Sequence, residues 1–295
     1  MRRDIYQTIT DKIVRQLEEG VRPWHQPWNA DHLQGRISLP RRYNGVPYRG
    51  VNVIALWMEA LAKGYSAPCW MTFKQALDLG SCVRKGEHGS LTVYADSIRR
   101  MEEGKEEPTE IHFLKGYIVF NVEQIDGLAA GYYDRPEAPR ETVEAIVHAE
   151  SFFRATGATI VHGGNRACYV QRTDTVHMPC LDTFRDAESY YATLAHECTH
   201  WTMHPTRLNR SFERKRWGDE GYAMEELVAE LGAAFLCTEL QLTPEIREDH
   251  ASYIANWLQV LKNDNRAIFT AASHAQRAAD FVTGLQKQVE VEAAA

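Results

Sequence analysis

The 295-residue chain lacks the features that mark membrane proteins, secreted proteins and zinc ribbons. It contains no apolar run of about 18 residues, so no transmembrane helix is expected, and its first residues form no apolar signal core. None of the six cysteines lies in a C-x-x-C pair, which argues against both a zinc ribbon and a disulfide framework. These absences favour a protein of a reducing cytoplasm that has no membrane partner.

The charge of the chain is small but unevenly distributed. The formal net charge is −7, yet residues 1–100 hold 15 Lys and Arg against 9 Asp and Glu, a net +6, and the remaining residues carry −13. The first third also holds four of the seven tryptophans, which are Trp24, Trp28, Trp57 and Trp70. A basic, aromatic-rich first third indicates a nucleic-acid-facing module joined to a second unit. The opposite charges should also attract the two units to each other.

The hydrophobic pattern predicts an α+β fold in two domains. In residues 1–125 we expect three helices and a long β-hairpin, and an apolar residue at every fourth position predicts that the first helix covers residues 4–19. Residues 126–140 hold three Gly/Pro clusters and are interpreted as a linker. Residues 141–295 should form the second domain.

The second domain is predicted to pack helices around a small sheet. A helix over residues 142–156 precedes the strands, and a second helix follows them over residues 187–204, ended by Pro205. Residues 225–240 form a strongly apolar helical pattern, and two more helices are expected after it.

The segment His196-Glu197-Cys198-Thr199-His200 carries the clearest chemical signal. On a helix, residues four apart lie on one face, so both imidazoles can bind one metal ion and Glu197 can act as general base toward a metal-bound water. The pentapeptide arises by chance in roughly 4% of sequences with this His and Glu content, and the alternative is a helix with two ordinary histidines. Its apolar surroundings favour a site for zinc, with manganese or another divalent ion as the alternative.

A third protein ligand is expected on the apolar helix that follows the motif. His204 continues the four-residue spacing, but it lies about 12 Å along the helix axis from His196, too far for one ion. Glu226 and Glu230 sit four apart on an otherwise apolar helix, where a buried acid needs a partner or a metal. We assign Glu226 as the ligand and Glu230 as the carboxylate that orients a ligating histidine, with exchanged roles as the alternative. Glu225 is expected on the exposed face.

Two further features near the motif have both a functional and a structural interpretation. Tyr222, Tyr190 or Tyr191 could donate a hydrogen bond to an oxyanion, but each is more readily explained as a tyrosine of the core or the surface. The extended segment 166–179 could offer a strand edge to a peptide, or it could form an ordinary hairpin.

Basic and aromatic side chains are interleaved in the first 85 residues. This combination binds single-stranded nucleic acid, because cations follow phosphates and aromatic rings stack on unpaired bases. Trp57 lies in a helical pattern that indicates a core position, whereas for Trp24 and Trp28 stacking and structural roles are balanced. The residues expected to contact DNA are Trp24, Trp28, Arg41, Arg42, Tyr43, Tyr48, Arg49, Lys74, Arg84 and Lys85.

The sequence resembles the ArdC-type antirestriction proteins of conjugative plasmids over almost its whole length. The similar segments include YNGVPYRGVNVIALW, GYSAPCWMTFKQALDLG and VRKGEHGS in the first half, and LAHECTHWT, RLNR and YAMEELVAELGAAFL in the second. The resemblance implies an N-terminal domain that binds single-stranded DNA and a C-terminal zincin-like metallopeptidase domain of gluzincin type. His196, Glu197, His200 and Glu226 match the metal-site motif of the family.

The resemblance also implies a biological role. Such a protein acts in the bacterial cytoplasm, where it protects plasmid DNA that enters as a single strand from host restriction endonucleases. Its partners would be single-stranded DNA and, in addition, the restriction endonucleases or other DNA-bound proteins. Two alternatives are a DNA-dependent metalloprotease that cleaves DNA-bound proteins, and a DNA-coating protein whose metal site is structural.

Overall fold

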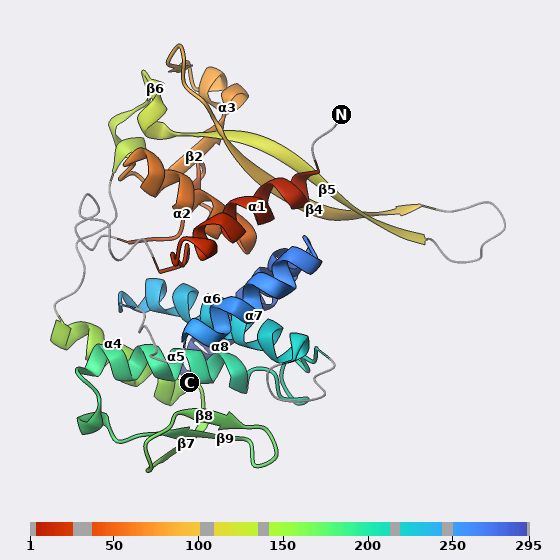
Figure 1. Cartoon of the computed structure of the whole chain (residues 1–295). Coiled ribbons are helices and arrows are strands. Elements are labelled where there is room, and N and C mark those ends of the chain that lie inside the picture. Colours follow the sequence, from red (N-terminus) through yellow and green to blue (C-terminus); the bar gives the residue numbers. More distant parts are fainter. Residues whose placement is uncertain are drawn as a thin grey trace.

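The computed structural model describes residues 4–25, 37–100, 109–134, 142–212, 219–243 and 250–293. In Figure 1 the N-terminal half lies above the C-terminal half, with helices of both halves stacked between the upper and lower sheets. This mixture of helices and sheets confirms the α+β fold class. Within the described ranges, no helix combines the length and apolar character needed to cross a membrane.

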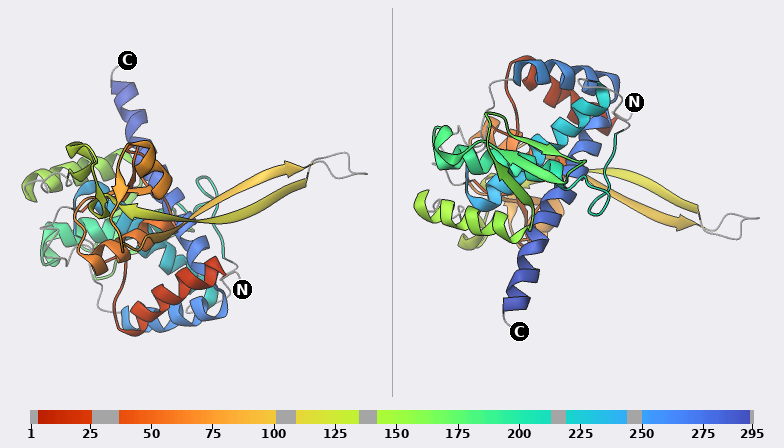
Figure 2. Two further views of the ribbon diagram at one scale, coloured as in Figure 1. Left: turned by 90° about the horizontal axis from the view of Figure 1, so that it is seen from above. Right: turned by 90° about the horizontal axis from the view of Figure 1, so that it is seen from below.

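The N-terminal half is built on a four-stranded sheet with the order β1-β2-β5-β4. Strands β4 and β5 form the predicted long hairpin, which is paired from Ser90 opposite Val119 to Arg100 opposite Thr109. This hairpin projects well beyond the body of the protein (Figures 1 and 2). The strands of this half are β1 (Arg41–Arg42), β2 (Cys69–Thr72), β3 (Cys82–Val83), β4 (Ser90–Arg100), β5 (Thr109–Asn121) and β6 (Ile125–Asp126).

Three helices accompany this sheet, and the first shows why the sequence pattern was informative. They are α1 (Ile5–Glu18), α2 (Val51–Lys63) and α3 (Phe73–Asp78). Helix α1 begins after Asp4, whose carboxylate accepts the backbone N–H of Tyr6. The four-residue apolar spacing places Ile9, Ile13 and Leu17 on one buried face of α1.

The C-terminal half packs five helices with a three-stranded sheet of order β7-β9-β8. Strand β7 is parallel to β9 and β8 is antiparallel to it, so β8 is an edge strand. The elements are α4 (Thr142–Ala155), β7 (Thr159–His162), β8 (Cys168–Val170), β9 (Thr175–Met178), α5 (Ala187–Trp201), α6 (Glu220–Leu240), α7 (His250–Asn263) and α8 (Ala267–Ala293). Helix α5 ends at Trp201, three residues before the predicted end at His204.

The two halves share one apolar core. Helix α1 packs against α7 and α2 packs against α8. Trp24 meets Trp257 edge to face at 5.7 Å between ring centroids, and Trp57, a core residue as predicted, lies 6.3 Å from Phe235. Burial of apolar surface therefore helps to hold the halves together, and the attraction between their opposite net charges stays a prediction.

The predicted linker is partly built into the N-terminal half. Residues Ala130–Tyr133 form a short 3₁₀ helix, and the Tyr133 hydroxyl donates a hydrogen bond of 2.6 Å to the carbonyl of Ile125. Tyr132 and Tyr133 pack on a small apolar cluster that includes Met71. The remaining predicted linker residues, 135–140, lie outside the described part of the chain.

Helices α5 and α6 approach closely because α6 carries a glycine at the contact. A Cβ atom on Gly232 would lie 2.5 Å from Thr199 Cγ2 and 2.8 Å from Thr199 Oγ1. Thr199 cannot easily turn away, since its hydroxyl donates to the carbonyl of Ala195 at 2.8 Å. Gly232 thus sets the distance between the two helices that carry the candidate site.

We expect Gly232→Ala to lower the free energy of unfolding by about 1–3 kcal/mol, because the added methyl group overpacks this contact. The double variant with Thr199→Ala should recover most of the loss, since it removes the side-chain atoms that the methyl group meets. Chemical denaturation of the wild type, both single variants and the double variant measures both effects. A Gly232→Ala protein as stable as the wild type would contradict the close approach.

Candidate metal centre

Helix α5 presents the pentapeptide motif from a buried, well-anchored position. It begins at Asp186, whose carboxylate accepts the backbone N–H of Ser189 at 2.7 Å. Hydrogen bonds from Ser189, and then from Arg185, lower the pKa of Asp186 to about 2. At the other end of the helix His196 is 4% exposed and Glu197 is 2% exposed. Packing on both sides of α5 therefore fixes the direction of these side chains.

His196, His200 and Glu226 bring their ligand atoms to one point, all within 4.8 Å of one another. The two Nε2 atoms lie 3.2 Å apart, and oxygens of Glu226 lie 3.5 Å from His196 Nε2 and 3.7 Å from His200 Nε2. Two imidazole nitrogens and one carboxylate oxygen form a ligand set that suits zinc and leaves a coordination position open. The residues present therefore fit a divalent ion.

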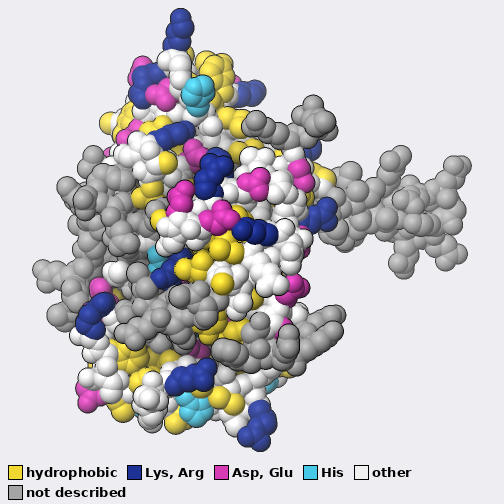
Figure 3. Space-filling view, in the orientation of Figure 1, with side chains coloured by type: hydrophobic (Ala, Val, Ile, Leu, Met, Phe, Trp, Pro, Cys, Tyr) yellow, Lys and Arg dark blue, Asp and Glu magenta, His cyan; other side chains and the backbone are white. Residues whose placement is uncertain are grey.

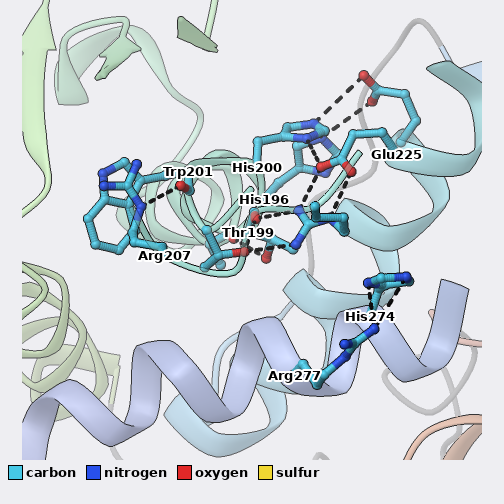
Figure 4. A network of polar contacts seen from close by, with 12 residues as sticks. His196, Thr199, His200, Trp201, Arg207, Glu225, His274 and Arg277 are labelled. Carbon is cyan, nitrogen blue, oxygen red and sulfur yellow. Dashed lines mark hydrogen bonds and ion pairs between the residues drawn. The ribbon is translucent and has the colours of Figure 1, made fainter. Parts of the chain in front are cut away.

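The expectation that Glu225 lies on an exposed face is wrong. Its side chain is 5% exposed, and Oε1 lies 3.0 Å from His200 Nδ1, as Figure 4 shows. Helix α6 is buried on almost every side, so position 225 has no solvent-facing direction. A carboxylate on the far nitrogen of a ligating histidine fixes the orientation of the ring. We therefore infer that Glu225 orients the ring of His200, which is the role that we assign to Glu230 for the other histidine.

Arg210, which the sequence analysis missed, holds Glu225 in place. It is 3% exposed and donates to both carboxylate oxygens, from Nε at 2.8 Å and from Nη2 at 2.7 Å. Nη2 also donates to the carbonyl of Thr199 at 2.9 Å, near the end of α5. A ligating histidine commonly has such a supporting network, but no spacing in the sequence selects Arg210 for it.

Glu230 lies beside the other histidine, as assigned. It is 5% exposed, and its Oε1 is 3.8 Å from His196 Nδ1. That distance is an ion-pair distance and exceeds a hydrogen bond. The role of Glu230 in orienting His196 stays a prediction.

The charges of the cluster are strongly coupled. Burial by itself lowers the pKa of His200, but the carboxylates of Glu226 and Glu225 outweigh it and raise this pKa to about 10. Burial would raise the pKa of Glu226, yet His200 and His196 outweigh it and lower that pKa. The carboxylate of Glu226 is therefore held in the charged form that can bind a cation.

A cavity of about 160 Å³ opens beside the ligand cluster. Glu197, Glu226 and Tyr222 line it, and Ala167 and Tyr169 at strand β8 form another wall. Burial and then the charge of Glu226 raise the pKa of Tyr222, so its hydroxyl keeps its proton. Glu197 is thus placed at the open side of the candidate metal site.

The other tyrosines considered, and His204, lie elsewhere. Tyr190 bonds to His162 Nε2 at 2.8 Å, and Tyr191 stacks on Phe153 at 6.2 Å. His204 follows the end of α5, where its Nδ1 lies 2.8 Å from Thr206 Oγ1. Among the three tyrosines, only Tyr222 lines the cavity beside the ligand cluster.

Half of the predicted DNA contacts gather at a groove between the two halves. The groove has a volume of about 1140 Å³ and is bordered on the C-terminal side by residues of α6 and α8. Its N-terminal side is formed in part by five predicted residues, which are Arg41, Arg42, Tyr43, Tyr48 and Arg49. On the face seen in Figure 3, basic and acidic side chains are intermingled, without one continuous basic patch.

The structure corrects the expected stacking role of Trp24. Its ring is 0% exposed and packs on Trp257, so no base can reach it. Tyr48 is 8% exposed, with the Arg42 guanidinium 5.5 Å from the centre of its ring, which leaves little of that ring for a base. Trp28 lies outside the described residues.

Several predicted cations are already paired with acids. Arg49 forms an ion pair with Asp280 of α8. Lys74 Nζ lies 2.7 Å from Asp78, and Arg84 Nη2 lies 2.8 Å from Glu87. Lys74, Arg84 and Lys85 also lie outside the groove lining. Arg41 and Arg42 line the groove, and no ion pair joins either of them to an acid in the described part of the chain, so these two arginines are favoured within the predicted set.

The hairpin carries exposed aromatic residues that the sequence analysis did not single out. Tyr94 and Tyr117 are each 44% exposed and meet edge to face at 6.4 Å. Phe113 lies on the same face, with Lys115 Nζ 4.9 Å from the centre of its ring. The alternation of Phe113, Lys115 and Tyr117 along one strand was the signal that could have revealed this face.

Two family models match the chain. One is described as the N-terminal domain of the anti-restriction factor ArdC and matches residues 3–120. The other is a zincin-like metallopeptidase family and matches residues 147–274, which include the whole ligand cluster. Fold and site together thus define a two-part protein in which an ArdC N-terminal domain is joined to a zincin-like metallopeptidase domain.

Solved structures and curated relatives narrow this class. The metal-free crystal structure of the antirestriction protein ArdC from plasmid R388 is similar with a TM-score of 0.82 and 44% identity, over 97% of this chain and 98% of that one. Its Mn(II)-bound structure is similar with a TM-score of 0.79 and 43% identity, over 96% of this chain and 98% of that one. The chain belongs to the ArdC family of antirestriction proteins.

Two further relatives span the same residues. The uncharacterized protein y4eC of Sinorhizobium fredii is 42% identical over 97% of this chain and 94% of its own length. A DNA primase TraC of Escherichia coli is 34% identical over 98% of this chain, which spans only 28% of that larger protein.

Substitutions of Glu225, Glu226 and Glu230 on α6 should differ in their effect on metal binding. Glu226→Gln removes a ligand and is expected to weaken divalent-metal binding more than either Glu225→Gln or Glu230→Gln, which should each cost about 10- to 100-fold. Titration of metal-depleted protein with zinc or manganese measures the three affinities. If Glu230→Gln weakens binding more than Glu226→Gln, the two assigned roles are exchanged.

Proposed function

We propose that this protein binds single-stranded DNA through its N-terminal half, holds a divalent metal in its C-terminal half, and protects incoming plasmid DNA from host restriction endonucleases in the bacterial cytoplasm. The convergence of His196, His200 and Glu226 at one buried point carries the metal part of this proposal. Zinc is the first candidate because of the ligand set. The Mn(II)-bound structure of the ArdC protein from plasmid R388 supports manganese as the alternative.

The residues around the ligand cluster suit peptide hydrolysis. When bound, a zinc ion lowers the pKa of a water toward neutrality and polarises a carbonyl group. Glu197, on the open side of the cluster, is the group that takes the proton of the attacking water. Tyr222, which keeps its own proton, donates a hydrogen bond to the oxygen that becomes negative.

Strand β8 supplies an edge for an extended peptide. Its residues border the cavity that Glu197 also lines, so a strand added to this edge would lie beside that cavity. Arg207 fixes the hairpin of β8 and β9 to the end of α5, since its Nη1 lies 3.0 Å from Asp174 and its guanidinium lies 3.9 Å from the centre of the Trp201 ring. These contacts support a substrate that is a protein segment in extended conformation.

Glu197→Gln separates proteolysis from DNA coating. We expect the variant to bind metal and DNA like the wild type but to lose peptidase activity on DNA-bound proteins. The other two carboxylates that line the cavity cannot replace its proton acceptor, because Glu225 is paired with Arg210 and Glu226 is the assigned metal ligand. Glu188→Gln, which changes a half-buried glutamate at the start of α5, is the matched control and should keep activity.

A plasmid-transfer assay into restricting cells then decides between the hypotheses. Loss of protection in Glu197→Gln alone would favour a protease that acts on restriction endonucleases or other DNA-bound proteins. Full protection would favour a DNA-coating protein and would show that hydrolysis is not needed. The assay needs equal amounts of both variants and the wild type in the cell.

The double variant Arg41→Gln, Arg42→Gln tests the DNA surface. We expect weaker binding of an oligothymidine and a salt dependence reduced by up to about one unit of log–log slope per lost phosphate contact. Arg154→Gln removes one exposed charge of α4 away from the groove and should have no effect. Binding titrations at several salt concentrations measure the affinity and its salt dependence. Duplex DNA is expected to bind more weakly than the oligothymidine. Unchanged affinity and slope in the double variant would remove Arg41 and Arg42 from the interface.

A further inference from the structure

Two buried side chains of the N-terminal half lie beside the candidate metal centre without being part of it. His25, 8% exposed, and Arg22, with 9% of its side chain exposed, follow the end of α1. Both approach Glu230 of α6, about 200 positions further along the sequence. The residues of the proposed hydrolysis do not explain this contact.

Glu230 connects these two residues to a metal ligand. Its Oε2 lies 3.2 Å from His25 Nε2 and 3.9 Å from Arg22 Nη1. Its other oxygen, Oε1, lies 3.8 Å from Nδ1 of His196. One carboxylate therefore spans the boundary between the halves, with the N-terminal half on one oxygen and the ligand on the other.

A carboxylate of α6 lies at the Nδ1 atom of each candidate ligand histidine, 3.0 Å away at His200 and 3.8 Å away at His196. His200 has Glu225 at its Nδ1, and Arg210 stands behind that carboxylate. His196 has Glu230 at its Nδ1, and His25 and Arg22 stand behind that one. The difference is the origin of the outer groups, since Arg210 belongs to the C-terminal half and the other two belong to the N-terminal half.

An apolar contact at this place would join the halves with a smaller desolvation cost. Burying a guanidinium and a carboxylate carries a desolvation cost that is offset only by close pairing. Burial lowers the pKa of Arg22 and the charge of Glu230 opposes that shift. Beside this contact the ring of Trp24 packs on Trp257 across the same boundary, so the buried charges adjoin an apolar contact.

We propose that His25 and Arg22 are positioning residues of the metal centre, which hold Glu230 against His196. The N-terminal half then completes the outer support of a site whose three ligands all belong to the C-terminal half. This inference rests on the proposed metal site and adds a part of it that lies outside the zincin-like region of residues 147–274.

Metal titration of the full-length protein tests this role. We expect His25→Ala to weaken binding of cobalt(II), used as a spectroscopic substitute for zinc, by about 10-fold. The visible absorption bands of the bound cobalt should also change, because a less restrained His196 alters the ligand geometry. His25→Gln retains a hydrogen-bond donor and should recover part of both effects.

Thr10→Val is the matched control. The Thr10 hydroxyl donates to the carbonyl of Asn265 at 2.7 Å across the same boundary, without touching Glu230. We expect the control to bind cobalt with wild-type affinity and spectrum. Thermal unfolding of all metal-free variants shows whether His25→Ala is folded at the titration temperature. If His25→Ala is unfolded there, the same cobalt titration of Arg22→Gln tests the proposal.

The double variant His25→Ala, Glu230→Gln shows whether His25 acts through Glu230. We expect it to bind cobalt no more weakly than Glu230→Gln alone, since the two changes interrupt one path. Additive losses, or a His25→Ala protein with wild-type affinity and spectrum, would overturn the inference and leave the metal site intact. A wild-type protein that binds no cobalt, zinc or manganese would overturn the proposed metal site itself.

Discussion

Three glutamates on one buried helix are the constraint on which the site depends. Glu225, Glu226 and Glu230 extend from α6, which is enclosed on almost every side, and a buried carboxylate is tolerated only with partners. The partners are the two histidines of α5, and behind them Arg210. The acids and histidines can meet only because α5 and α6 come very close at Gly232. A small residue at one helix contact thus permits the whole arrangement of charges.

Packing also joins the helix that carries these glutamates to the N-terminal half. The rings of Trp24 and Trp57 pack on Trp257 and Phe235, so the unit expected to bind DNA and the unit that carries the ligands form one packed body. Such an interface does not open at low cost, because each large ring would return to water. The proposed DNA surface and the ligand cluster therefore belong to one packed body.

Local signals in the sequence were sufficient for several elements and for the candidate ligand cluster. The four-residue spacing predicted α1, and the alternating runs predicted the β4–β5 hairpin. The motif led to His196 and His200, and the acid pair on the next apolar helix led to Glu226, which the fold places beside them. Packing between distant segments was not visible in these patterns. Glu225 was misplaced because every helix was assumed to keep one exposed face, and Trp24 because its partner Trp257 is more than 200 positions away. Arg210 was missed because its contact with Glu225 depends on the path of the chain after α5, which no local pattern shows.

Composition also overstated the basic character of the DNA surface. The first third is rich in Lys and Arg, but Arg49, Lys74 and Arg84 are each paired with an acid, and an exposed ion pair offers a phosphate less than an unpaired cation does. Glu239 and Asp280 also border the groove that Arg41 and Arg42 line. A long run of phosphates would meet these acids as well as the arginines. The proposed binding of single strands would then draw more of its free energy from rings that stack on unpaired bases than from contacts with phosphates.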